Sequence, residues 1–272
     1  MSLLQQTEEL AKQYNIRPSR SKGQNFLIDE RAYDAMIAAA ELSGNETVLE
    51  VGPGLGFLTE RLAAKSQNVI AVELDDKVAA VVKKRLEEKG ITNATIYNED
   101  ILNFTGAWVT AARAALNFVV VANLPYNISS YFLRKFIAGN EGELLPERMT
   151  LMLQKEVGER LVAGPGDMSL LAVSVQFYCV PTLYSLVPAA SFWPAPKVGS
   201  AVVRFVRDDS RKRQLASLSI TEKEFFRVVK IGFSARRKML KANLSAGLRL
   251  PLATVIEAFS TSSISTTYRP QE

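Results

Sequence analysis

Short apolar runs alternate with longer amphipathic stretches over the first two-thirds of the chain. Runs rich in β-branched and aromatic residues are typical of buried strands, whereas apolar residues three and four positions apart are typical of helices. We expect strands at residues 47–51, 69–73, 94–97, 118–122, 149–153, 182–187 and 200–206. Helices are expected between them at 58–64, 77–89, 130–138 and 155–162. This alternation predicts an α/β fold in which helices cover a seven-stranded, mostly parallel sheet.

The pattern changes after residue 206. Residues 207–213 carry many charges and are expected to form a linker, and from Thr221 onward apolar residues recur at helical spacing with short breaks. A change from alternating strands and helices to helices alone indicates a second, smaller unit. We therefore predict a larger α/β domain at 1–207 and a small all-helical domain at 208–272.

The composition is that of a globular protein with a full core, since 47% of the 272 residues are hydrophobic. The longest apolar stretches are interrupted well before the roughly 18 residues that a membrane span requires, and residues 1–6 contain no signal-like apolar segment. We expect a cytoplasmic protein without membrane association. The single cysteine, Cys179, stands among apolar residues and is expected to be a buried core residue.

Histidine is absent from the sequence. Ser-His-Asp triads, cysteines activated by histidine and metal sites with histidine ligands are therefore excluded, and no metal is expected. The net charge is +5, yet residues 204–249 contain thirteen Lys or Arg against four Asp or Glu. A basic excess confined to one segment indicates a surface that binds a polyanion such as nucleic acid.

A glycine-rich turn, Gly-Pro-Gly-Leu-Gly at 52–56, follows the first predicted strand. Glycines between a strand and a helix let a ligand approach the backbone closely. Phe57 stands where a dinucleotide-binding turn has its third glycine, and Pro53 lies within the turn, so a pyrophosphate is the poorer match. Glu50, just before the turn, instead suits the amino and sulfonium groups of S-adenosylmethionine.

Two further acids mark the ends of the next strands. Glu73 ends the second predicted strand, where a carboxylate can accept both hydroxyls of a ribose. Asp100 follows the third, where it can accept a hydrogen bond from an adenine amino group. Because the carboxyl ends of parallel strands meet at one edge of a sheet, these acids together predict an adenosine site.

The quartet Asn-Leu-Pro-Tyr at 123–126 directly follows the predicted strand 118–122. Asn123 offers a side-chain carbonyl and Leu124 a backbone carbonyl, both of which can accept from a base amine, while Pro125 fixes its own φ. Tyr126 offers an aromatic face on which a base can stack. The quartet therefore predicts a site for a planar nucleobase amine.

Together with several other motifs, these residues resemble the small-subunit ribosomal RNA adenine dimethyltransferases, the KsgA family, which are related to the Erm antibiotic-resistance rRNA methyltransferases. The resemblance covers nearly the whole chain. Its carriers are Gly-Gln-Asn-Phe-Leu at 23–27, Glu-Val-Gly-Pro-Gly-Leu-Gly at 50–56, Val-Glu-Leu-Asp at 72–75, Asn-Glu-Asp at 98–100, Asn-Leu-Pro-Tyr-Asn-Ile-Ser-Ser at 123–130, Phe-Trp-Pro-Ala-Pro-Lys-Val-Gly-Ser at 192–200 and Phe-Ser-Ala-Arg-Arg-Lys at 233–238.

The resemblance implies a Rossmann-like class I methyltransferase domain that uses S-adenosyl-L-methionine and releases S-adenosyl-L-homocysteine. It implies methylation of the exocyclic amines of two adjacent adenines in a hairpin loop near the 3′ end of small-subunit rRNA, with a role in small-subunit ribosome biogenesis. The expected partner is small-subunit rRNA in an immature small ribosomal subunit, and the expected oligomeric state is a monomer.

The resemblance also implies the residues of each site. The cofactor-binding set is Gln24, Asn25, Leu27, Glu50, Gly52, Gly54, Gly56, Glu73, Leu74, Asp100, Ile101 and Asn123. The catalytic set that holds the target adenine is Asn123, Leu124, Pro125 and Tyr126, with Phe192 as a second aromatic wall.

The basic segment supplies a candidate RNA surface. Arg227, Lys230, Arg237 and Lys241 fall at helical spacing, so we expect them on one face, with apolar residues mainly on the other. The complete RNA-binding set predicted is Arg227, Lys230, Arg236, Arg237, Lys238 and Lys241.

Three other functions are compatible with parts of the pattern. An Erm-type enzyme would use the same chemistry on large-subunit rRNA. The segments 197–200 and 233–238 resemble the small-subunit enzymes more than the Erm enzymes. A non-catalytic nucleic-acid-binding factor on the same fold is disfavoured because Asn123, Tyr126, Glu73 and Asp100 are intact. A small-molecule methyltransferase would leave the basic segment unexplained. The chain also departs from the family in a less basic stretch at 17–22, in a loop at 164–168 without Tyr-Gly and in an end at Glu272 where relatives continue.

Overall fold

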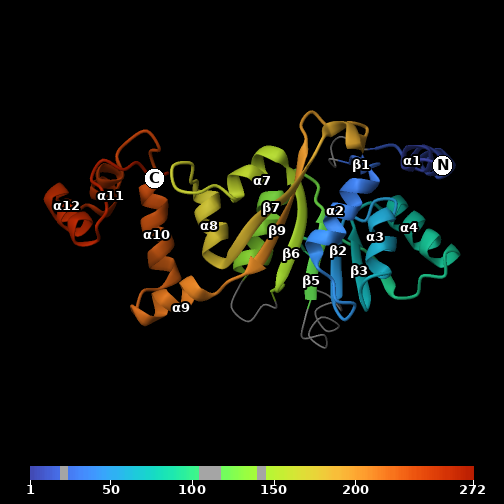
Figure 1. Cartoon of the computed structure of the whole chain (residues 1–272), viewed down its shortest axis with the longest axis horizontal. Helices are drawn as coiled ribbons and strands as arrows, with labels where there is room; N and C mark the ends of the chain where they lie inside the picture. Colours follow the sequence, from blue (N-terminus) through green and yellow to red (C-terminus); the bar gives the residue numbers. More distant parts are fainter. Residues whose placement is uncertain (19–23, 104–117, 140–144) are drawn as a thin grey trace. The chain divides into compact units, whose positions relative to one another are not determined.

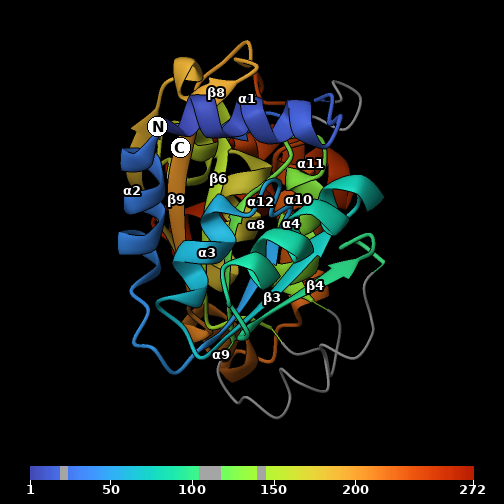
Figure 2. The same ribbon diagram turned by 90° about the vertical axis from the view of Figure 1, so that its right-hand side faces the viewer.

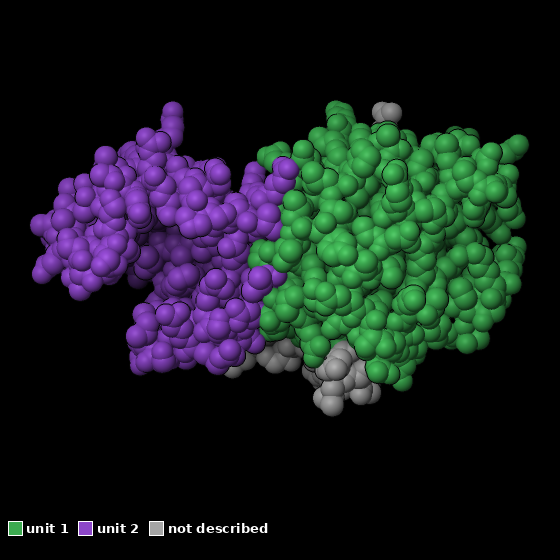
Figure 3. Space-filling model, viewed as in Figure 1, with its two compact units in different colours: residues 1–158, 181–207 green, residues 159–180, 208–272 purple. Residues whose placement is uncertain are grey.

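The structure is a computed structural model that describes residues 1–18, 24–103, 118–139 and 145–272. Its chain forms two compact units, coloured separately in Figure 3. The larger unit contains residues 1–158 and 181–207, and the smaller unit contains residues 159–180 and 208–272.

The larger unit is built on a seven-stranded sheet in the order β4-β3-β2-β5-β6-β9-β7 (Figure 1). The five strands from β4 to β6 pair in parallel, and β9 is antiparallel to β6. Each predicted strand is present, with a shift of at most three residues at either end, so the α/β prediction is confirmed. The strands are β2 (Thr47–Val51), β3 (Asn68–Glu73), β4 (Ala94–Asn98), β5 (Phe118–Asn123), β6 (Arg148–Gln154), β7 (Cys179–Val187) and β9 (Ser200–Arg207).

The order of the strands places a crevice at the centre of the sheet. β2 lies between β3, which follows it in the chain, and β5, from which the chain continues in the opposite direction. In open α/β sheets, ligands bind at such a reversal, outside the carboxyl ends of the strands. β2 is buried throughout and β5 is buried up to its last residue, Asn123, as expected for central strands covered on both faces.

Three helices pack against strands of the sheet (Figure 2): α2 (Glu30–Ala40) contacts β6 and β9, α3 (Phe57–Ala63) contacts β3, and α4 (Asp76–Glu88) contacts β3 and β4. Local sequence fixes where two of them begin. Asp29 accepts the Arg31 amide before α2, and Asp75 accepts two amides at the start of α4, which satisfies donors that a helix leaves free.

Among the described residues of the larger unit, the other helices longer than one turn are α1 (Leu3–Gln13), α6 (Ser129–Leu133), its π-helical continuation η1 (Arg134–Ala138) and α7 (Lys155–Leu161), which extends into the smaller unit. The helices predicted at 58–64, 77–89 and 155–162 are confirmed as α3, α4 and α7. The helix predicted at 130–138 is α-helical only in its first half. α1 and α2 were not predicted.

A second, two-stranded sheet joins β1 (Phe26–Leu27) to β8 (Phe192–Trp193), which follows the short 3₁₀ turn η2 (Ala189–Ser191). The strands are antiparallel, with Leu27 opposite Phe192. The Ile28 amide donates to the Ser191 carbonyl over 2.8 Å, and the Ser191 hydroxyl donates to Asp29 over 2.8 Å. This pairing was not predicted, and it holds the N-terminal motif beside the predicted aromatic wall.

Apart from the end of α7 and the start of β7, the described regular elements of the smaller unit are helices: α8 (Leu170–Tyr178), α9 (Ser210–Ser217), α10 (Glu222–Gly232), α11 (Leu240–Leu248) and α12 (Leu252–Thr261). Four aromatic rings explain why α8 groups with the later helices. Phe177 stacks on Phe225 with ring centroids 4.9 Å apart, Tyr178 stacks on Phe226, and the Tyr178 hydroxyl donates to Glu222 over 2.7 Å.

The expected linker needs correction, whereas the expected domain boundary stays a prediction. The stretch 207–213 is not a linker throughout, because α9 begins at Ser210. The compact unit also takes in residues 159–180, which the expected division at 207/208 assigned to the α/β part. That the units are separate domains stays a prediction. Cys179 is buried, as expected. No helix among the described residues is both long and apolar enough to span a membrane.

Candidate active site

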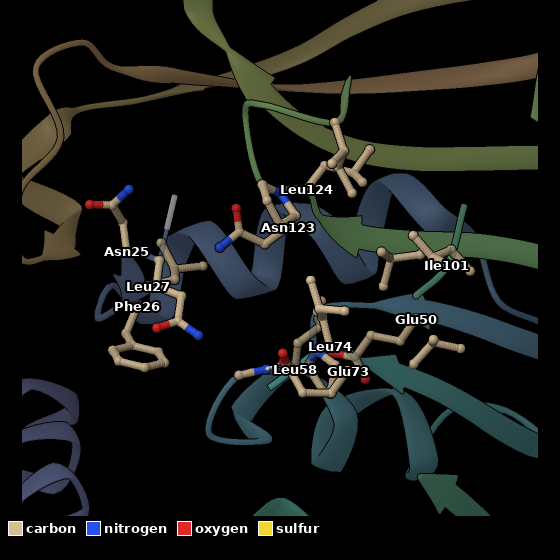
Figure 4. Close-up of a pocket in the computed structure, with 18 of the residues that line it drawn as sticks. Asn25, Phe26, Leu27, Glu50, Leu58, Glu73, Leu74, Ile101, Asn123 and Leu124 are labelled. Carbon is tan, nitrogen blue, oxygen red and sulfur yellow. Dashed lines mark hydrogen bonds between the residues drawn. The ribbon is translucent and has the colours of Figure 1, made fainter. Parts of the chain in front are cut away.

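A cavity of about 250 Å³ opens at the carboxyl ends of β2, β3 and β5 (Figure 4). Every residue of the predicted catalytic set lines it, and so does every predicted cofactor residue except Gly56. Leu27 faces Phe192 across the small sheet, and this pairing brings Gln24 and Asn25 to the same cavity. The structure therefore brings together residues that lie more than 150 positions apart in the sequence.

The turn between β2 and α3 has the shape that its glycines permit. Gly52, Gly54 and Gly56 all adopt positive φ, between 56° and 86°, which is a conformation that other residues rarely adopt. A Cβ on Gly56 would lie 2.5 Å from a methyl carbon of Val82 on α4. Gly56 thus stands behind the cavity wall, where it allows α4 to pack close to the turn.

Glu73, at the end of β3, holds the glycine turn in place. One carboxylate oxygen accepts the Asp75 amide over 2.9 Å and the other accepts the Gly54 amide over 3.4 Å. Burial raises the pKa of this carboxyl, and these backbone hydrogen bonds oppose the rise. Each oxygen keeps a lone pair, so Glu73 can still accept from a ligand hydroxyl.

Glu50, in the neighbouring strand β2, is the most unusual group in the cavity. Its side chain is 1% exposed and neither carboxylate oxygen has a hydrogen-bond partner among the described residues. Burial raises its pKa to about 8, an effect that the Glu73 carboxylate increases and the nearby Thr59 hydroxyl offsets in part. A buried carboxylate without a partner is costly, and a cationic ligand beside it would remove that cost.

Asp100 closes the turn after β4. Its two oxygens accept the Leu102 amide over 2.9 Å and the Asn103 side-chain amide over 3.1 Å. The next residue, Ile101, is 4% exposed and forms part of the cavity wall. Asp100 therefore shapes the turn and keeps lone pairs for a ligand, and Ile101 supplies an apolar surface beside it.

Asn123 and Leu124 lie across the cavity from Glu50 and Glu73 (Figure 4). The described part of the chain makes no hydrogen bond to the Asn123 side chain. The Leu124 amide donates to the Met152 carbonyl of β6 over 3.2 Å, which fixes the backbone at the end of β5. The amide group of Asn123 thus keeps its full capacity to accept and donate hydrogen bonds.

Tyr126 is held by a contact that sequence reasoning missed. Its hydroxyl lies 2.8 Å from that of Ser200, the first residue of β9, which is fully buried. Burial raises the Tyr126 pKa. Ser200 was noted only as part of a motif, and nothing in the spacing of two residues 74 positions apart indicates that they touch.

Several other lining residues carried no sequence signal. Tyr33 on α2 is buried and donates to the Leu27 carbonyl over 3.0 Å, and Leu58 on α3 is buried and also lines the cavity. Tyr33 lies in a helix that was not predicted, and Leu58 begins the predicted helix 58–64 but was assigned no role. Phe192 is 3% exposed, so it is a wall of the cavity more than an open platform. Gly23 and the basic residues at 20–22 lie outside the described residues.

The predicted RNA-binding residues lie in the smaller unit, and all are exposed except Lys241, which is half-buried. The expectation that they share one helix face is wrong, because α10 ends at Gly232 and α11 begins at Leu240. Arg236, Arg237 and Lys238 stand in the intervening turn. The buried Asn243 amide donates to the Gly232 and Ala235 carbonyls over 2.6 and 3.0 Å, which fixes this turn.

The fold and the site define a class I methyltransferase. Among solved structures, this chain is similar to a dimethyladenosine transferase from Plasmodium falciparum, with 28% identity, a TM-score of 0.69 and coverage of 90% of this chain and 85% of that one. It is also similar to the 23S rRNA methyltransferase ErmE, with 25% identity, a TM-score of 0.72 and coverage of 91% and 93%.

Comparison of the sequence identifies the family more narrowly than the similarity of the structures does. The family described as ribosomal RNA adenine dimethylase matches residues 16–256. A protein of Dehalococcoides mccartyi named ribosomal RNA small subunit methyltransferase A is 40% identical over 94% of this chain and 84% of its own length. A protein of the same name from Alkaliphilus oremlandii is 35% identical over 95% and 88%. The chain belongs to the ribosomal RNA adenine dimethylase family.

Proposed function

We propose that this protein transfers methyl groups from S-adenosylmethionine to the exocyclic amines of adenines in small-subunit rRNA. The observation that carries the proposal is one cavity lined by two groups of residues, the acids Glu50, Glu73 and Asp100 at the ends of β2, β3 and β4, and Asn123 and Tyr126 at the end of β5. The first group suits an adenosine that carries a cationic amino-acid tail. The second suits a flat base with an amine.

The residues present fit the cofactor. Glu73 has lone pairs for ribose hydroxyls, Asp100 for an adenine amine, and the unpartnered Glu50 suits an ammonium group. When bound, S-adenosylmethionine supplies a methyl carbon made electrophilic by its sulfonium. Gln24 and Asn25 would help to hold it from the N-terminal segment, and the apolar Leu27, Leu74 and Ile101 would surround it.

Asn123 and Leu124 act on the target amine. An adenine amine is a weak nucleophile because its lone pair is delocalised into the ring. Hydrogen bonds from the amine to the Asn123 side-chain oxygen and the Leu124 carbonyl would turn the nitrogen out of conjugation and favour the positive charge that develops on it. After transfer, the amine loses a proton to water, so the site needs no histidine. Positioning of this kind lowers reaction barriers by about 7–11 kcal/mol in well-oriented systems.

The substrate must present an unpaired base. An adenine within a helix cannot reach a cavity of this kind, so the target is a loop whose bases can be turned outward and stacked on Tyr126. We propose that exposed cations of the smaller unit, chiefly Arg227, Lys230 and Arg236–Lys238, bind the phosphates of the same RNA. The protein would act as a cytoplasmic monomer on an immature small subunit.

Sequence similarity favours the small subunit over the large one. Relatives named for the small subunit reach 40% identity, against 25% for ErmE. The opposing alternative, a binding factor without activity, is disfavoured by the intact cavity.

The test is methyl transfer from labelled S-adenosylmethionine to unmodified small and large ribosomal subunits, with the modified bases identified by mass spectrometry. Dimethyladenine in small-subunit rRNA alone is the expected result. Label in large-subunit rRNA would move the protein to the Erm group, and cofactor binding without transfer to either would overturn the enzymatic proposal.

A further inference from the structure

Lys135 forms hydrogen bonds to the turn that follows β4, and no sequence motif or residue spacing predicts them. It lies on η1, half-buried, and its ammonium donates to the Leu102 carbonyl over 2.7 Å and to the Ile101 carbonyl over 3.4 Å. It also lies 6.0 Å from the centre of the Phe136 ring, at the limit of cation–π distance. Its neighbour Arg134 is exposed and makes no such contact to the turn among the described residues.

The two carbonyls belong to the turn after β4 that begins with Asp100. The Asp100 carboxylate accepts a hydrogen bond from the Leu102 amide, and the Lys135 ammonium donates to the carbonyls of Ile101 and Leu102. An ammonium has three donors and no acceptor, and charged donors form stronger hydrogen bonds than neutral ones. The turn is therefore held by hydrogen bonds to two side chains of opposite charge, Asp100 and Lys135.

The helix that carries Lys135 starts at the base-holding quartet. α6 begins at Ser129, whose hydroxyl donates to the Pro125 carbonyl over 3.4 Å. The helix then changes to π-helical geometry at Arg134, a local irregularity that is frequent at functional sites. Lys135 therefore ties the turn that carries Asp100 and Ile101 to the element that follows Asn123–Tyr126.

We propose that Lys135 is a positioning residue that holds the Asp100–Asn103 turn so that Asp100 selects adenine in the cofactor. This inference rests on the proposed function, because it assumes that the adenine of S-adenosylmethionine lies at Asp100. A carboxylate accepts from the 6-amino group of adenine and repels the 6-oxygen of hypoxanthine. A turn released from Lys135 still carries the carboxylate but no longer fixes its direction.

The experiment compares S-adenosylhomocysteine with S-inosylhomocysteine, which differ at that one position, by calorimetric titration of the full-length protein. Lys135→Met removes the donors and keeps an unbranched stem. Lys135→Arg keeps a charged donor and serves as the conservative rescue. Arg134→Met is the matched control, since it removes one positive charge from the neighbouring position. Circular dichroism checks folding, and Lys135→Gln replaces Lys135→Met if the latter does not fold.

We expect Lys135→Met to weaken binding of S-adenosylhomocysteine by about tenfold, the usual scale for a hydrogen bond to a charged group, and to change binding of the inosine compound little. Its preference for adenine then falls by the same factor, while Lys135→Arg keeps most of it and Arg134→Met all of it. In transfer assays, the KM for cofactor rises and kcat at saturation is kept.

An unchanged preference in Lys135→Met, or equal weakening of both compounds, would overturn the positioning role. The wild-type protein tests the proposed function separately. If it binds both compounds equally, the adenine assignment of Asp100 fails, and the inference about Lys135 fails with it.

Discussion

The two sides of the cavity differ in how much of their polar capacity is already engaged within the protein. On the acidic side, both oxygens of Glu73 and both of Asp100 accept hydrogen bonds from neighbouring turns. On the opposite side, the Asn123 side chain accepts none from the described residues, and Tyr126 has one partner, Ser200.

This difference matches two kinds of ligand. A cofactor of constant shape is best held by groups fixed in advance, because little conformational freedom is then lost on binding. A target amine that changes as methyl groups are added needs acceptors that bind it during the reaction. We therefore propose that the acidic side determines affinity for the cofactor and that the Asn123 side determines the rate of transfer.

The sharpest separation of the two sides is Asn123→Ala. We expect methyl transfer to fall by about 10²–10³-fold or more, the range seen when one group that stabilises developing charge is removed. Although the resemblance also counts Asn123 among the cofactor-binding residues, affinity for S-adenosylmethionine should stay near that of the wild type, because Asn123 is assigned to the target amine and the acidic side is untouched. Single-turnover transfer rates and calorimetric cofactor titration measure the two effects. Equal loss of rate and cofactor affinity would contradict the division between the sides.

Gly56→Ala tests the support of the acidic side. Its new methyl group would meet Val82 at 2.5 Å, in a backbone conformation with φ at 86°. Gly90→Ala is the matched control, since Gly90 has φ at 68° and no atom within 4 Å of a new Cβ. We expect Gly90→Ala to lower the free energy of unfolding by about 1–2 kcal/mol through backbone strain alone. Gly56→Ala should cost about 1–3 kcal/mol more and also weaken cofactor binding.

Denaturant unfolding measures the free energy of unfolding of the two variants, and calorimetric titration measures their affinity for the cofactor. If Gly56→Ala matches Gly90→Ala in both measurements, the close packing behind the turn has no part in shaping the site.

Glu50 differs from Glu73 and Asp100 because its carboxylate accepts no hydrogen bond from the described residues. The pH dependence of stability tests its protonation state. Its folded-state pKa of about 8 lies above the ordinary value for glutamate, so the folded protein binds a proton that the unfolded chain releases. Stability from this group is fully present below the unfolded pKa and is lost as pH rises toward 8. Between these pH values, wild-type stability should fall relative to Glu50→Gln by up to about 1.4 kcal/mol per pH unit.

The measurement is denaturant unfolding of both proteins without cofactor across that range. At pH 7, cofactor binding should also release a proton from the wild type and not from Glu50→Gln, which titration in buffers of different ionisation enthalpy detects. Parallel stability curves for the two proteins would show that Glu50 is ionised throughout.

The smallest effect is expected on the Asn123 side, at the hydroxyl pair of Tyr126 and Ser200. Tyr126→Phe and Ser200→Ala each remove the same hydrogen bond while leaving the ring in place, so each should slow transfer several-fold, equivalent to about 1 kcal/mol. The double variant should be no slower than the single ones. Additive losses in the rate of transfer would mean that the two residues act separately.

Much of the scaffold could be predicted because its strands repeat one simple pattern. Residues 118–122 form a continuous apolar run in a strand buried on both faces, and 182–187 form a β-rich run in an edge strand along which exposure alternates. The acids at 50, 73 and 100 could be placed together because parallel strands end at the same edge of a sheet. Motif spacing was therefore enough to assemble one side of the cavity.

The other features of the fold and the site depend on contacts that produce no periodic pattern in the sequence. Two-residue strands such as β1 and β8 are too short for a pattern, and the Tyr126–Ser200 contact joins segments that only the folded sheet brings together. The helical spacing from Arg227 to Lys241 was misleading, because Asn243 holds a break that apolar periodicity does not reveal. Lys135 had no signal at all, since its partners are backbone carbonyls.

The most direct test compares Glu73→Gln with Asn123→Ala in transfer to unmodified small subunits while the cofactor concentration is raised. Removing the Glu73 charge should raise the KM for S-adenosylmethionine by about tenfold or more, and saturating cofactor should restore most of its kcat. Asn123→Ala should remain slow at every cofactor concentration. Restoration of Asn123→Ala by cofactor, or failure to restore Glu73→Gln, would contradict the assignment of affinity and rate to opposite sides of the cavity.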